Sequence, residues 1–251
     1  MTTGNVPETG RTRTTIAIAA GVVAALAIPL SALGRLAGLW GPMPIMIFAF
    51  LATMIGILMA VIMGLVGVLR RKGRPWSAYQ VRGSLVALVL GGVVMVPVGS
   101  FLAQGLPYPP IHDISTDTDN PPKYVALQLE RDATKAPNTT DYDPKVAAQQ
   151  KKGFPDLKPV DMAMPADAAF KRALAAAEAM KWRIAAAVPE EGRIEAVDVT
   201  FWSGFIDDVV IRITPVDDTR SILDIRSLSR VGGGDAGKNG MRIREFLTKL
   251  K

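Results

Sequence analysis

The sequence predicts an α-helical membrane anchor of three spans, followed by an α+β domain. We expect this domain to have an antiparallel sheet of four or slightly more strands, with two helices on one face. Long apolar runs are confined to the first 104 of the 251 residues. The rest has the mixed composition of a globular domain. Near its end, two amphipathic segments enclose four short segments with strand-like alternation.

The three apolar runs follow an N-terminal tail of residues 1–15 and cover residues 16–34, 45–69 and 84–103. Each is long enough to cross a bilayer as a helix, which takes about 20 residues. No run carries an acidic, basic or histidine side chain near its centre, as a transport path would normally require. We therefore interpret the runs as an anchor, with the lipid bilayer as the partner. A cleaved signal peptide remains an alternative for the first run.

The distribution of Lys and Arg predicts the orientation of this anchor. The first 104 residues hold 8 Lys and Arg against one acid, whereas the remainder holds 21 against 22. Five of the basic residues lie in the connector 70–83, which should therefore stay in the cytoplasm. This predicts a multi-pass protein of the inner membrane, with a cytoplasmic N-terminus and residues 105–251 in the periplasm or outside the cell. The near-neutral charge of that part argues against nucleic acid as a partner.

Residues 105–163 are rich in Pro, Asp, Asn and Thr, which predicts an irregular arm with one short strand at 124–129. The α+β domain is expected at 164–251. The stretch PADAAFKRALAAAEAMK predicts its first helix and NGMRIREFLTKLK its last. The four strands between them are separated by short turns, which favour an antiparallel meander.

Alternation along these strands assigns their two faces. It predicts that Val197, Val199 and Phe201 face the helices together with the apolar residues of the next two strands. The opposite face would then carry the candidate binding residues Trp202, Arg212, Arg226 and Arg230. Two interpretations remain open for this face: a solvated ladder of salt bridges, or a platform for an anionic ligand or a partner.

The stretch PPIHDISTDTDNPP contains the only histidine of the chain, His112. An enzyme could use His112 as a base with Asp113 or Asp117, on an anionic lipid or glycan. A divalent-cation module could use Asp113, Asp117 and Asp119, although no EF-hand register is present. The alternative is structural, because Asp, Ser and Thr side chains bond to nearby backbone amides and form turns.

The charges of this stretch complement those of the strands. We expect Asp113 or Asp117 to dock beside Arg226 or Arg230. The carboxylate and the guanidinium would then neutralise each other without a metal ion.

The motif GGGDAG formally fits a dinucleotide-binding loop, but too few residues follow it to complete a βαβ unit, so it predicts a turn before the last helix. No cofactor is expected, and the absence of cysteine rules out disulfides and thiolate sites.

Four ordered blocks carry a family resemblance: PPIHDISTDTDNPP, FPDL, GRIEAVDVTFWSGFIDDVVIRITP and DIRSLSRVGGGDAGKNGMRIREFL. Over about residues 107–250 the chain resembles the domain of unknown function 1499 family, in a membrane-anchored bacterial version. It departs from the family pattern at Ser203 and at Gly233–Gly234. The resemblance implies a fold and a location in the cell envelope, but no reaction. The anchor and the absence of a catalytic constellation predict a non-enzymatic, extracytoplasmic domain that binds an envelope protein, another envelope component or an anionic ligand, or that has another envelope-associated role.

Overall fold

The structure is a computed structural model that describes residues 8–39, 105–200 and 204–250, with isolated positions between 41 and 103. The chain divides into two compact units, and residues 105–200 and 205–250 belong to the second. In the first unit, helix α1 runs over Glu8–Leu36 and includes Pro29. Among the described residues, no helix has both the length and the apolar character needed to cross a bilayer. The greater part of the second and of the third predicted span lies outside the described residues.

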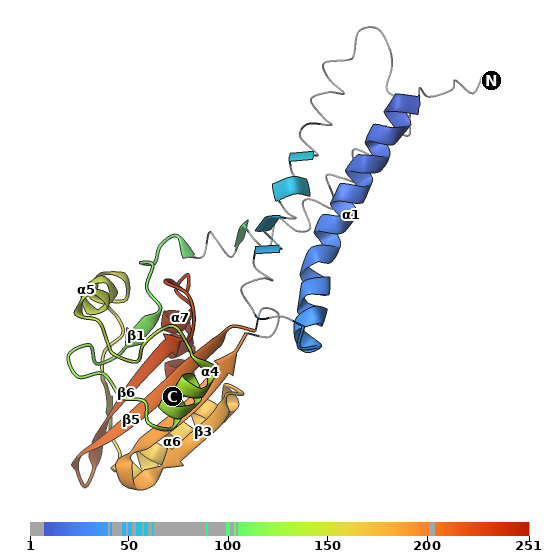
Figure 1. Cartoon of the computed structure of the whole chain (residues 1–251). Helices are drawn as coiled ribbons and strands as arrows, with labels where there is room; N and C mark the ends of the chain where they lie inside the picture. Colours follow the sequence, from blue (N-terminus) through green and yellow to red (C-terminus); the bar gives the residue numbers. More distant parts are fainter. Residues whose placement is uncertain are drawn as a thin grey trace. The chain divides into compact units, whose positions relative to one another are not determined.

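The second unit is built on one antiparallel sheet (Figure 1). The strand order is β1-β6-β5-β4-β3, and β2 also pairs with β6. The strands are β1 (Asp113–Ser115), β2 (Val160–Met162), β3 (Arg183–Val188), β4 (Arg193–Val199), β5 (Ile206–Asp217) and β6 (Arg220–Ser229). The four predicted strands are present as β3 to β6, each antiparallel to the next.

The sheet has six strands because the arm contributes β1 and β2, which the sequence analysis did not predict. Both are three residues long and pair with β6, Ile114 opposite Ser227 and Asp161 opposite Ile222. A three-residue strand is too short to show alternation. Its formation depends on the backbone groups that the edge of β6 would otherwise leave unpaired.

Two helices cover one face of the sheet, as predicted. They are α6 (Ala166–Ala179) and α7 (Lys238–Lys249). Phe170 on α6 and Ile243 and Phe246 on α7 pack with Ile211 and Ile225 in the main core. The short 3₁₀ turn η1 (Pro189–Glu191) joins β3 to β4.

A third helix covers the opposite face. This is α4 (Ala126–Thr134), at the place where the sequence analysis expected a strand. Its Leu127 packs with Val197, Val210 and Leu228 in a second, smaller core. The expected strand is therefore wrong. The side chains of Leu127 and Arg131, four residues apart, are both buried on this sheet face, a spacing typical of a helix.

The predicted faces of β4 are reversed in the structure. Ala196 pairs with Val209, so Ala196 shares the α6–α7 face and Val197 lies under α4. Each alternating set of β4 mixes apolar and charged residues, so alternation alone could not choose between them, and a shift of one residue moves every side chain to the other face. The predicted faces of β5 and β6 are correct.

The glycine-rich turn lies between β6 and α7, as predicted, and together with the first turn of α7 it packs against the arm. A side chain at Gly237 would overlap the ring of Tyr108, and one at Gly240 would overlap the ring of Phe154. These two rings stack with their centroids 4.8 Å apart. The Asp235 carboxylate accepts hydrogen bonds from two backbone amides at the start of α7. Glycine is therefore needed here for close packing against the arm.

Candidate functional site

The second face of the sheet is crossed by residues 116–123, here called the strap, which continue from β1. The Asp117 carboxylate accepts hydrogen bonds from the amides of Asp119 and Asn120, at 3.1 and 2.8 Å, and so fixes the turn of the strap. The other Asp117 oxygen accepts one from Arg212 on β5 at 3.0 Å. Local side-chain bonding thus shapes the strap, and an ion pair ties it to the sheet.

Arg226 on β6 lies under the strap and is only 2% exposed. Its Nε and Nη2 atoms donate to the two carboxylate oxygens of Asp113, at 2.9 and 2.7 Å. Nη1 donates to the carbonyl of Pro122, and Nη2 also donates to that of Thr140. Burial disfavours the charged guanidinium, but the Asp113 carboxylate outweighs this and raises the pKa of Arg226. The expected docking of Asp113 beside Arg226 is present.

Two tyrosines flank the guanidinium. The guanidinium carbon of Arg226, Cζ, lies 5.2 Å from the ring centroid of Tyr124 and 5.2 Å from the ring centroid of Tyr142. The Tyr124 hydroxyl donates to the carbonyl of Asp208, and the Tyr142 hydroxyl donates to Gln150 on α5 (Pro144–Gly153). Burial raises the pKa of both phenols. Both tyrosines therefore remain protonated near neutral pH and act as packing groups for the arginine.

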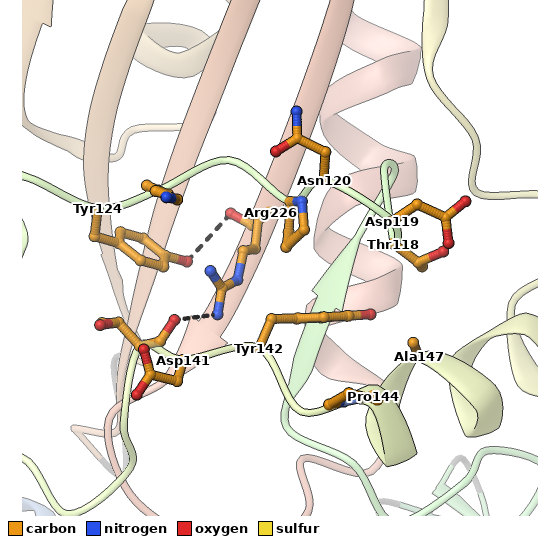
Figure 2. A pocket seen from close by; sticks show the side chains of 12 residues that line it. Thr118, Asp119, Asn120, Tyr124, Asp141, Tyr142, Pro144, Ala147 and Arg226 are labelled. Carbon is orange, nitrogen blue, oxygen red and sulfur yellow. Dashed lines mark hydrogen bonds between the residues drawn. The ribbon is translucent and has the colours of Figure 1, made fainter.

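A cavity of about 710 Å³ opens above this arrangement, here called the Arg226 cavity (Figure 2). Figure 2 shows Asn120 of the strap on one side and Asp141, Pro144 and Ala147 on the other, with Arg226 between them. Its volume is within the range of small-molecule sites. A second cavity of about 450 Å³ is also lined by the strap and shares only Thr118 and Asp119 with the first.

Comparison with known proteins places this domain in a family. Residues 113–250, more than half of the chain, match the family model described as protein of unknown function (DUF1499). The chain belongs to the DUF1499 family. No curated protein matches it significantly. The matched residues include every strand of the sheet and all the residues of the Arg226 cavity.

In this DUF1499 domain the candidate residues of the strap region have separate partners. Asp113 binds Arg226, Asp117 binds Arg212, and the exposed Asp119 pairs with Lys151 at 3.0 Å. His112 is half-buried and lines neither cavity. Among the described residues, no group of three acidic or histidine side chains is placed to hold a metal ion. The three aspartates are thus not brought together around one point.

The candidate residues of the sheet are also separated. Arg212 donates to both Asp117 and Asp224, and only Arg226 lines the larger cavity. Arg230 donates to the fully buried Asp208. The fourth candidate, Trp202, lies outside the described residues. The face that could have been a solvated ladder is therefore largely covered by α4 and the strap.

Sequence reasoning missed several charged residues that form buried ion pairs or hydrogen bonds on the two faces of the sheet. Glu195 is fully buried and accepts hydrogen bonds from the three backbone amides at the start of α4, at 2.8 to 3.1 Å. Arg131 on α4 shares the carboxylate of Asp208 with Arg230. On the other face, Arg242 of α7 bridges two aspartates of β4 and β5. A charged residue inside an alternating apolar strand, such as Glu195, was the available signal.

Proposed function

We propose that this protein is a membrane-anchored binding protein whose DUF1499 domain lies outside the cytoplasm and receives a ligand in the Arg226 cavity. The proposal rests on a difference between the residues below this cavity and the residues at its rim. Arg226 and the two tyrosines are held by protein partners, whereas Asn120, Lys123 and Asp141 at its rim make no side-chain hydrogen bond within the described part of the chain. A rigid floor below free polar groups suits binding.

The geometry favours binding over acid–base catalysis. A general base must lie within hydrogen-bonding reach of the group it deprotonates. His112 lines neither cavity, and the Asp113 carboxylate is occupied on both oxygens by Arg226. An enzyme using His112 with Asp113 would need a rearrangement of this buried ion pair.

The proposed anchor is supported by the uncharged run at residues 45–69 and by the basic connector 70–83. In α1, the side chains of Val23, Leu30 and Leu33 are more than half exposed. Exposed apolar side chains along one helix favour contact with lipid over contact with water.

The chain has no cysteine, which makes its topology directly testable. An Asp141→Cys variant should react with a membrane-impermeant maleimide in intact cells. A Ser77→Cys variant, in the connector predicted to be cytoplasmic, should react only after the membrane is permeabilised. The reverse pattern would overturn the proposed location.

A further inference from the structure

The Arg226 cavity has a floor, walls and a rim of different chemistry, and together they specify a class of ligand. This inference rests on the proposed function, because it names what the same cavity binds.

The floor provides one buried hydrogen-bond donor. A guanidinium carries five N–H groups. Four of those of Arg226 donate to Asp113, Pro122 and Thr140, and Nη1 makes only one of the two hydrogen bonds open to it within the described part of the chain. An uncompensated donor at this depth is costly, so an oxygen acceptor on a ligand would be favoured here.

The rim provides donors and acceptors from two segments. Thr118, Asn120 and Lys123 of the strap and Asp141 of the facing loop line the cavity. Figure 2 shows the hydroxyl of Thr118, the carboxamide of Asn120 and the carboxylate of Asp141. None of these four side chains is hydrogen-bonded within the described residues. Such a mixture matches a ligand whose polar groups both donate and accept, as hydroxyl groups do.

The charges at the cavity balance. Arg226 is neutralised by Asp113, and Asp119 at the rim pairs with Lys151. The two remaining charges, on Lys123 and Asp141, are opposite. A lining without net charge gives no electrostatic preference for a strongly anionic or cationic ligand.

The walls are flat and apolar. They include the ring of Tyr142, the pyrrolidine ring of Pro144 and the methyl group of Ala147, which Figure 2 shows, and Pro121 also lines the cavity. These groups suit the C–H faces of a pyranose ring, while the rim groups suit its hydroxyls. We propose that the Arg226 cavity binds a neutral saccharide, with Asp141 and Asn120 bonded to its hydroxyls and the free N–H of Arg226 bonded to a sugar oxygen.

The test is to probe the purified full chain, held in lipid nanodiscs, on an array of neutral oligosaccharides containing hexose and N-acetylhexosamine units. The best binder is then titrated against Asp141→Ala and against Asp218→Ala, an exposed aspartate in the β5–β6 turn. We expect Asp141→Ala to weaken binding roughly tenfold or more, with an unchanged melting temperature, because it removes hydrogen bonds to a charged group. Asp218→Ala should bind like the parent chain.

Absence of binding to every neutral sugar, binding to a parallel peptide array alone, or equal affinity for the Asp141→Ala variant would each overturn the saccharide assignment. Such a failure is distinguishable from failure of the proposed function. If Asp141→Cys is still labelled from outside intact cells, the proposed location stands. If a peptide of the parallel array binds the parent chain and Asp141→Ala weakens that binding, the Arg226 cavity remains a binding site and only the ligand class is wrong.

Discussion

Replacing Arg226 by alanine tests how strongly the strap is tied to the sheet. The substitution removes four hydrogen bonds and leaves the Asp113 carboxylate, itself 3% exposed, without its counter-ion. Removing one partner of a buried ion pair typically costs about 3–5 kcal/mol. Because each kcal/mol lowers the melting temperature of a domain of this size by about 2–4 °C, we expect a decrease of roughly 6–20 °C.

The assay is thermal unfolding of the full chain, followed by near-ultraviolet circular dichroism, together with limited proteolysis of residues 116–142. The matched control is Arg220→Ala. Arg220 is the same residue type in an exposed ion pair with Asp217, and such pairs contribute little to stability. Arg226→Ala should melt earlier and be cleaved faster, whereas Arg220→Ala should behave like the parent chain.

A double-mutant cycle separates the ion pair from the loss of packing. Asp113→Ala leaves the buried Arg226 unpaired, so it should also be strongly destabilising. The double variant should be destabilised by less than the sum of the two single variants, because neither charge is then left buried alone. Equal melting temperatures for Arg226→Ala and Arg220→Ala, or strict additivity in the cycle, would refute the reasoning.

Three further predictions, one of them with a control substitution, concern other parts of the domain. Glu195→Gln should destabilise it by about 2 kcal/mol and speed hydrogen exchange of the first amides of α4, because an uncharged group caps the helix less well. Gly240→Ala should cost about 1–3 kcal/mol in denaturant unfolding, because the new methyl group overlaps a buried phenyl ring, whereas Gly233→Ala, which meets no atom, should be neutral. The hydrogen bond from Arg244 lowers the pKa of Asp156. The Asp156 carboxylate therefore stabilises the folded domain at pH values above its unfolded-state pKa, and this stabilisation is lost as the pH falls through its folded-state pKa. Asp156→Asn should reduce the acid sensitivity of the melting temperature below about pH 4. A pH profile identical to that of the parent would contradict the last prediction.

The sequence by itself determined the elements whose signal is local. Helices α6 and α7 and strands β3 to β6 follow from periodicity and turn residues, and their antiparallel order follows from the short turns. The contact between Asp113 and Arg226 was also predictable, although the two residues lie far apart in the chain, because an aspartate-rich stretch was expected to dock on a sheet face that carries arginines.

Only the tertiary structure decided the rest. Helix α4 begins where Glu195, nearly 70 residues away in the chain, accepts the hydrogen bonds of its first amides. Strands β1 and β2 exist because the edge of β6 offers unpaired backbone groups. The cavity itself requires the strap, the loop carrying Asp141 and β6 to converge. Contacts between distant segments leave no periodic trace in any one of them, so local patterns could not reveal them.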